Sequence, residues 1–130
     1  MSSKIFFSIE FDFHASPQLL YQYLSTPSGL SEWFADNVNS RGENFEFIWD
    51  DGEEHAKLIH SKNNERIRFQ WINGEDDEAD CYFEFKIEVD EITKDVSLIV
   101  SDFSEEDELE ESKLLWENLI SDLKQVLGSA

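Results

Sequence analysis

The feature that most constrains the fold of this chain is an alternation of apolar and polar residues that recurs along most of its length. In residues 4–13, every odd position from 5 onward is isoleucine or phenylalanine, whereas positions 8, 10 and 12 are polar. Because successive side chains of a strand point to opposite faces, this pattern predicts a strand with one buried and one solvated face. The same period of two returns in residues 45–50, 56–60, 67–71, 81–89 and 95–103.

Turn-forming residues separate these segments at short intervals. Asp50-Asp51-Gly52, Asn63-Asn64 and Asn73-Gly74 are typical of tight connections, and the last is followed by an acidic loop. Strands joined by such short turns pair with their sequence neighbours in an antiparallel arrangement. We therefore expect an antiparallel meander, which commonly has one packed face and one solvated face.

Two short helices are predicted between the first strand and the meander. Ser16-Pro17 and Thr26-Pro27 each place a capping hydroxyl before a proline at the first helical position. These are the only two prolines of the chain. We expect the two helices to direct seven side chains into the core, namely Leu19, Leu20, Tyr23, Leu24, Leu30, Trp33 and Phe34.

The pattern changes to a helical period near Ser104. Apolar residues then recur at helical spacing, at Leu109, Trp116, Ile120, Leu123 and Leu127. Gly128 is suited to ending this helix, which would run for about 20 residues. A single amphipathic helix must bury its apolar stripe, and the concave face of the sheet offers the surface for it. We therefore predict one α+β domain over residues 1–130, in which a curved antiparallel sheet wraps around a long C-terminal helix.

Several short motifs carry a resemblance to a known family. They are Leu20-Tyr21-Gln22-Tyr23-Leu24-Ser25-Thr26-Pro27, Leu30-Ser31-Glu32-Trp33-Phe34, Gly42 with Phe45 and Phe47, Arg66-Ile67-Arg68-Phe69-Gln70-Trp71, and Trp116 with Leu119, Leu123 and Lys124. In their order and spacing they resemble the START-like, or helix-grip, superfamily, and within it the activator of Hsp90 ATPase homologues. The resemblance covers essentially the whole chain. It implies a cavity between the long helix and the curved sheet.

Members of that superfamily bind sterols, lipids, hormones or polyketides, catalyse cyclisation, or act as co-chaperone modules. The fold that the resemblance implies therefore does not decide the function. The short link from the last strand to the last helix, residues 102–107, has no obvious extra lid. We accordingly do not expect a very large lipid cavity.

Composition excludes several classes of partner. The chain has 10 Lys and Arg residues against 30 Asp and Glu residues, so its formal net charge is −20. Such a charge repels nucleic acids and anionic membrane surfaces. The single cysteine, Cys81, excludes an internal disulfide and a zinc site built from several cysteines. Because no leader or membrane-spanning pattern is recognisable, we expect a cytoplasmic protein without membrane insertion.

Residues with catalytic or metal-binding chemistry form no recognisable motif. His55 and His60 are an odd number of positions apart in one strand, so we expect them to face opposite sides and not to share a metal ion. The acidic runs 50–54 and 75–78 lack the oxygen spacing of an EF-hand loop and are interpreted as solvated hairpin tips. We expect no metal, no cofactor and no catalysis, although an acid or base inside the cavity stays an open alternative.

The four tryptophans are the most informative side chains, because each lies on the expected inner face of a different element. Core packing alone would explain such positions, whereas a pocket that holds a ligand is the functional alternative. We place the ligand site at Trp33, Phe34, Trp49, His60, Trp71, Phe83, Phe85 and Trp116. His60 is the polar member because it shares the expected face of Ala56 and Leu58. A buried histidine without a ligand is the alternative for that residue.

Three functional hypotheses follow. The first is the binding of a small apolar or amphipathic ligand between the sheet and the helix. The second is a protein-interaction module, which predicts a cavity filled by the chain's own side chains and a partner with a basic surface. The third is an enzyme of the cyclase or aromatase type, which requires a buried carboxylate or histidine with a shifted pKa. The sequence alone decides neither the ligand nor the oligomeric state.

Overall fold

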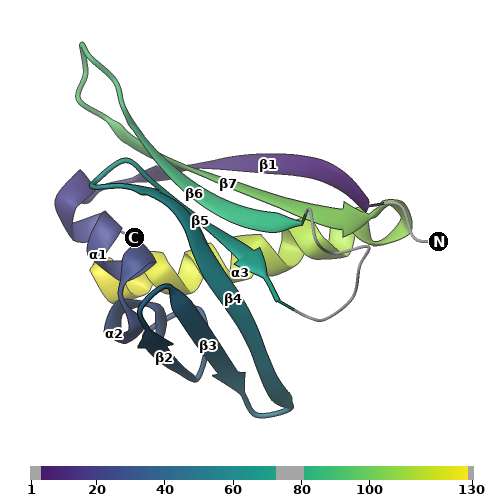
Figure 1. Ribbon diagram of the computed structural model, residues 1–130. Coiled ribbons are helices and arrows are strands. Elements are labelled where there is room, and N and C mark those ends of the chain that lie inside the picture. The colour runs from purple at the N-terminus through teal and green to yellow at the C-terminus, as the bar shows by residue number, and fades with distance from the viewer. Residues whose placement is uncertain (1–3, 73–80, 129–130) are drawn as a thin grey trace.

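A computed structural model describes residues 4–72 and 81–128 of the chain. Seven antiparallel strands form one curved sheet in the order β1-β7-β6-β5-β4-β3-β2 (Figure 1). The strands are β1 (Lys4–Phe13), β2 (Asn37–Arg41), β3 (Asn44–Trp49), β4 (Gly52–Lys62), β5 (Arg66–Trp71), β6 (Tyr82–Val89) and β7 (Val96–Glu105). The predicted meander is confirmed for β2 to β7, and β1 is the edge strand that pairs with β7. The segment that contains α1 and α2 therefore leads from β1 at one edge of the sheet to β2 at the other.

Two short helices follow the first strand, as predicted. They are α1 (Pro17–Ser25) and α2 (Pro27–Leu30). The Ser16 hydroxyl accepts a hydrogen bond from the Leu19 amide at 3.1 Å, and the Thr26 hydroxyl accepts one from the Gly29 amide at 3.0 Å. Both caps therefore satisfy a backbone donor that the first helical turn leaves without a partner.

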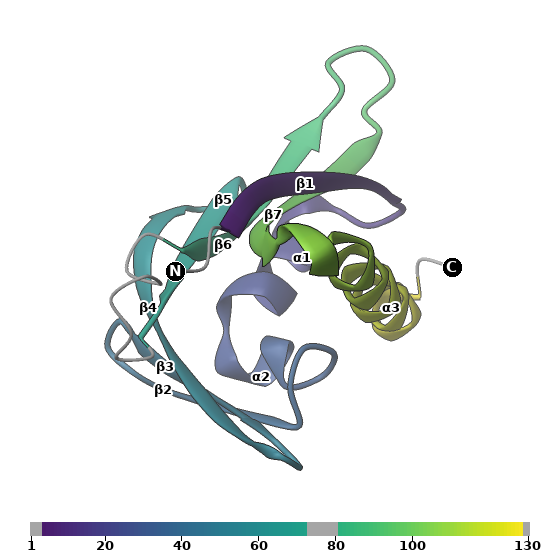
Figure 2. The same cartoon turned by 90° about the vertical axis from the view of Figure 1, so that its right-hand side faces the viewer.

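The long C-terminal helix lies inside the curve of the sheet together with α1 and α2 (Figure 2). A short 3₁₀ turn, η2 (Glu106–Glu108), leads from β7 into α3 (Leu109–Leu127). Gly128 ends the helix in the left-handed conformation, with φ of 71°, as the sequence predicted. Trp116, Ile120 and Leu123 are the buried residues of this helix. The helix-grip architecture is thus confirmed.

The structure differs from the sequence-based expectations at several element boundaries. Helix α2 ends at Leu30, so Trp33 and Phe34 follow it in a turn, although both are buried. The prediction that Leu19 faces the core is wrong, because its side chain is 40% exposed. Strand β2 was not predicted, since Val38 is its only buried residue. The turn at Asn73-Gly74 and the acidic run 75–78 lie outside the described residues.

The core occupies the space between the inner face of the sheet and the helices. Its largest fully buried side chains are Phe47, Phe69, Phe83, Phe85, Leu20, Leu24, Leu30, Ile67, Leu98, Ile120, Leu123 and Val100. Phe6, which breaks the alternation of the first strand, is 53% exposed on the outer face. Among the described residues, no helix has the length and apolar character needed to cross a membrane.

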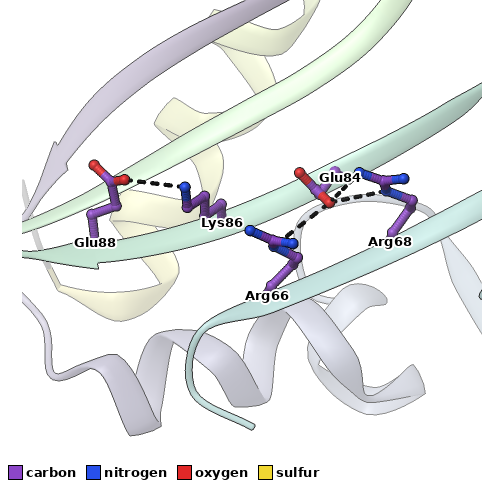
Figure 3. A network of polar contacts seen from close by, with 5 residues as sticks. All are labelled: Arg66, Arg68, Glu84, Lys86 and Glu88. Carbon is purple, nitrogen blue, oxygen red and sulfur yellow. Dashed lines mark hydrogen bonds and ion pairs between the residues drawn. The ribbon is translucent and has the colours of Figure 1, made fainter. Parts of the chain in front are cut away.

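The outer face of the sheet carries an ion-pair network (Figure 3). Glu84 lies on β6 and is only 8% exposed. Its carboxylate accepts a hydrogen bond from Arg68 Nε at 2.9 Å and lies 3.8 Å from Arg66 Nε. Lys86 and Glu88 form a second pair at 3.3 Å. Arg68 therefore points outward from the sheet, and two arginines of the chain itself balance the charge of the buried Glu84 carboxylate.

Candidate functional site

A pocket of about 360 Å³ lies between α3 and one end of the sheet. Its position follows from topology, because β3, β5 and β7 run in the same direction and their final residues meet at the same end of the sheet. Six lining residues are apolar or aromatic, namely Phe34, Trp49, Trp71, Leu115, Trp116 and Leu119. Three are acidic, namely Asp51, Glu54 and Asp102. The volume lies at the small end of the range for small-molecule sites.

Phe34 occupies the centre of the aromatic cluster beside the pocket. Its ring stacks on those of Trp116, at 5.9 Å between centroids, and Phe83, at 5.5 Å. Its amide donates to Leu30 O at 2.8 Å, and its carbonyl accepts from Trp49 Nε1 at 3.1 Å. The turn after α2 thus holds Phe34 by its backbone on both sides, and Phe34 in turn positions two tryptophans.

Trp71 forms the wall of the pocket at the end of β5. It lies 4.8 Å from the ring of Phe83 and 5.9 Å from that of Phe47, measured between centroids. Both phenylalanines are almost completely buried, whereas Trp71 is partly exposed. The inner phenylalanines therefore support Trp71 from behind and leave part of its ring facing the pocket.

Within residues 4–72 and 81–128, three of the four indole N–H groups donate hydrogen bonds to other residues of the chain. Trp33 Nε1 donates to Tyr23 O at 2.8 Å, Trp49 Nε1 to Phe34 O, and Trp116 Nε1 to Asp102 Oδ2 at 2.9 Å. These bonds fix the orientation of the rings. Because their donors are engaged, these three tryptophans offer a ligand their ring surfaces.

Asp102 is the titratable group that the structure adds to the site. It continues the inner face of β7 after Val100, and Phe7 is its partner in β1. Oδ1 accepts the Phe103 amide at 2.7 Å and Oδ2 accepts Trp116 Nε1. Burial raises the pKa of Asp102 to about 6, although both hydrogen bonds and, more weakly, Lys4 act to lower it. The third hypothesis, a cyclase-like enzyme, required a carboxylate of this kind.

The residues expected at the site fall into three groups. Phe34, Trp49, Trp71 and Trp116 line the pocket. Trp33, Phe83 and Phe85 are buried in the aromatic core behind it, where Trp33 and Phe85 lie 5.7 Å apart between ring centroids. His60 lies on the outer face of the sheet.

The face predicted for His60 is wrong because β4 contains a β-bulge. Leu58 pairs with Phe69, but His60 pairs with the next residue of β5, Arg68, so two residues of β4 oppose one of β5. The extra residue, Ile59, reverses the alternation beyond it. His60 is therefore exposed and lines a separate small hollow with Lys62 and Arg66.

The same bulge places His55 and His60 on one face, against the expectation of opposite faces. They remain five positions apart, or roughly 16 Å along a strand, so they do not share an ion. His55 instead lies near Glu46 and Glu53, and the three offer ligand atoms within 4.8 Å of one another. His55 and Glu53 are exposed, and exposed acidic groups of this kind are common without a metal.

Sequence reasoning missed the acidic members of the pocket. Asp51 and Glu54 belong to a run interpreted as a solvated hairpin tip, yet that hairpin reaches the pocket rim. The signal for Asp102 was present in the sequence. Extending the alternation of Val96, Leu98 and Val100 by one step places it on the buried face.

A family model described as a START-like superfamily domain matches residues 1–129. The solution structure of the Aha1 dimer from Colwellia psychrerythraea has a TM-score of 0.82 at 19% identity, covering 95% of this chain and 96% of that one. A Bacteroides fragilis protein is 34% identical, with a TM-score of 0.67 and coverage of 97% and 92%. A Mesorhizobium loti protein has a TM-score of 0.77 at 17% identity, covering 95% and 97%. No curated protein matches the chain.

Proposed function

This chain belongs to the START-like superfamily, and we propose that it binds a small, partly apolar ligand in the pocket between α3 and the sheet, without catalysing a reaction. The observation that carries the proposal is the pocket itself, which has a volume of about 360 Å³ and walls of large aromatic side chains. Sites for small organic molecules combine such walls with a few polar groups that orient the ligand. Asp102 is the polar group at the greatest depth.

Each lining residue has a distinct role in the proposal. Trp71 and Trp49 offer ring surface to the apolar part of the ligand, and Trp116 offers a third ring that Asp102 holds in place. Phe83 and Phe85 act indirectly, as the packed layer behind these rings, whereas Phe34 packs on both and also contributes to the wall. A volume of about 360 Å³ favours a small metabolite over a whole phospholipid.

Native and denaturing mass spectra of freshly purified protein test the proposal. If the ligand dissociates slowly enough to stay bound during purification, we expect the native spectrum to show additional mass that denaturation removes. The Trp71→Ala variant should lose that mass while it stays folded by circular dichroism. Ile92→Ala, at a 91% exposed site far from the pocket, is the control and should retain it. Equal retention by Trp71→Ala would contradict the proposal.

A protein-interaction module is the second candidate, and one observation supports it. Phe6, Phe103 and Tyr82 form an aromatic cluster on the outer face, with centroid distances of 5.4 Å and 5.1 Å along the row. Exposed aromatic surface of this kind is common at protein interfaces. The same native spectra distinguish the candidates, because a bare mass accompanied by dimers would favour interaction over ligand binding. A cytoplasmic location is part of the proposal, because a chain with a single cysteine cannot form the internal disulfides that are common in secreted proteins.

A further inference from the structure

The charge of the pocket points to one class of ligand. We propose that the ligand is an organic cation, in which a small aliphatic or aromatic body carries a protonated or quaternary ammonium group. This inference rests on the proposed function, because it names the ligand class of the same site. It is carried by two features of the pocket, the ring surfaces and the placement of Asp102.

The ring surfaces favour a cation. Phe34, Trp49, Trp71 and Trp116 all contribute to the wall. The face of an aromatic ring carries partial negative charge, and an ammonium group within about 6 Å of it is attracted, most strongly by tryptophan. Since the N–H groups of Trp49 and Trp116 are used within the chain, their faces are the parts that a ligand meets.

The charged residues of the wall are all acidic. Asp51, Glu54 and Asp102 line the pocket, and none of the lining residues in the described ranges 4–72 and 81–128 is lysine, arginine or histidine. An adjoining hollow shares Phe34 and Trp49 with the pocket and is also lined by acidic side chains without a basic one among the described residues. Acidic residues outnumber basic ones three to one in this chain, so their number alone decides little.

The placement of Asp102 decides more than the number of acids. Its carboxylate accepts two hydrogen bonds among the described residues, whereas an ionised carboxylate has about four acceptor positions. The faces of the surrounding rings carry partial negative charge, so they do not stabilise the negative charge of the carboxylate. A cation bound in the pocket would balance the negative charge of the Asp102 carboxylate and would also contact the aromatic ring faces.

Glu84 shows how this chain treats a carboxylate that has no such task. Like Asp102, it lies on a central strand with little access to solvent, but two arginines neutralise it, with Arg68 Nη2 at 2.9 Å. At Asp102 the nearest comparable influence is the field of Lys4, which is the weakest of the four contributions to its pKa. The cation that completes the Asp102 site is therefore expected to come from outside the chain.

Three probes with the same phenyl group and a similar chain length test the inference, namely 4-phenylbutylamine, 4-phenylbutanol and 4-phenylbutyrate. They carry a positive, a neutral and a negative head group at neutral pH. Calorimetric titration gives their affinities, and the indole N–H resonances of Trp49, Trp71 and Trp116 report whether each probe occupies the pocket. We expect the amine to bind about tenfold more tightly than the alcohol, and the carboxylate to bind most weakly.

Two matched variants connect this preference to the pocket. Asp102→Asn retains size and a hydrogen-bond acceptor but removes the charge, and it should lower the preference for amine over alcohol about fivefold. Glu53→Gln removes one charge from the same hairpin that carries Glu54, on the opposite face of β4 beside His55. This control should leave the preference unchanged. A preference that Asp102→Asn retains in full would overturn the assignment.

The remaining outcomes separate this inference from the function on which it rests. If the alcohol binds as tightly as the amine and shifts the same indole resonances, the pocket binds ligands but the inference of a cation is wrong. If none of the probes shifts those resonances at millimolar concentration, the result counts against the ligand-binding function itself and the inference fails with it.

Discussion

Helix α3 crosses two ends of the sheet that are built from different side chains. At the end where β7 begins, the interface is filled by Leu20, Leu24, Leu98, Ile120 and Leu123, each at most 1% exposed. We call this the closed end. The C-terminal part of α3 lies here, because Lys124 Nζ is 5.3 Å from the centroid of the Phe13 ring, at the end of β1 that pairs with the start of β7. At the end where β7 finishes, Trp116 bonds to Asp102 and the pocket remains. We call this the open end.

The difference shows how a single interface can be sealed in one place and hollow in another. Branched aliphatic side chains adjust and fill the space that a helix and a sheet enclose, which gives interiors their high density. Large flat rings, held by hydrogen bonds such as Trp49 to the Phe34 carbonyl, cannot collapse into the remaining space. The pocket at the open end therefore persists because the indole N–H bonds of Trp49 and Trp116 hold these rings in place.

The largest effect should separate two leucines of one helix, Leu123 at the closed end and Leu119 on the pocket wall. Leu123→Ala should cost about 4 kcal/mol in the free energy of unfolding, because it leaves a cavity among fully buried groups. Leu119→Ala, one turn earlier and partly exposed, should cost about 1 kcal/mol, since the lost atoms already border open space. Urea denaturation monitored by tryptophan fluorescence measures both.

For binding of the amine probe, we expect the opposite ranking of the two leucine variants. We expect Leu119→Ala to weaken binding of the amine probe and Leu123→Ala to leave it nearly unchanged at a temperature where the variant is folded. Equal loss of stability in the two variants would mean that the open end is as tightly packed as the closed end, and would remove the basis for the comparison.

The closed end was largely predictable from the sequence. Alternation identified the inner residues of β7, such as Leu98, and the helical period identified Ile120 and Leu123. Local capping signals located the starts of α1 and α2, because Ser16 and Thr26 act on amides only three residues away. Such signals involve only residues that are close in the sequence, so they can be recognised without knowing the tertiary structure.

The open end was predicted only in part, for two physical reasons. A β-bulge adds one residue to β4, and a strict period of two then assigns His60 to the wrong face. Asp102 was overlooked because the alternation of Val96, Leu98 and Val100 was not extended by one step to a carboxylate, a residue type that is common and mostly exposed in so acidic a chain. Four of the eight expected site residues line the pocket, because the sequence pattern identifies inner aromatic side chains but not which of them border open space.

Gly29 lies where α2 packs against α1, between the leucines of the closed end and Phe34 of the open end. The Gly29→Ala variant should show the second largest loss of stability. A Cβ atom at this position would lie 2.4 Å from Gln22 O and 2.6 Å from Tyr23 Cα, so α2 must move away from α1. We expect a loss of about 3 kcal/mol in the free energy of unfolding. Because α2 carries the turn that holds Phe34, binding of the amine probe should weaken as well.

Ser28→Ala, one position earlier, is the control for Gly29→Ala and should change stability by less than about 0.5 kcal/mol. The combination of lost stability and lost binding distinguishes Gly29→Ala from Leu123→Ala, which should lose stability alone. If Gly29→Ala binds the probe normally once folded, then Phe34 holds the open end without help from α2.

The smallest effect depends on pH and concerns Asp102. Its pKa in the folded protein is about 6, against an ordinary value of 3.8, so the folded state binds the proton more tightly than the unfolded state does. The stability that this proton contributes is complete below pH 3.8 and is lost as the pH rises through 6.

The Asp102→Asn variant has no carboxyl group to titrate at this position. Its free energy of unfolding, relative to that of the unmodified chain, should therefore rise by about 2 kcal/mol between pH 4 and pH 8. Glu53→Gln, at an exposed site, should show no such rise in parallel urea titrations. A flat difference for Asp102→Asn would mean that solvent or a cation of the chain compensates this carboxylate, and the open end would then differ from the closed end in shape but not in charge.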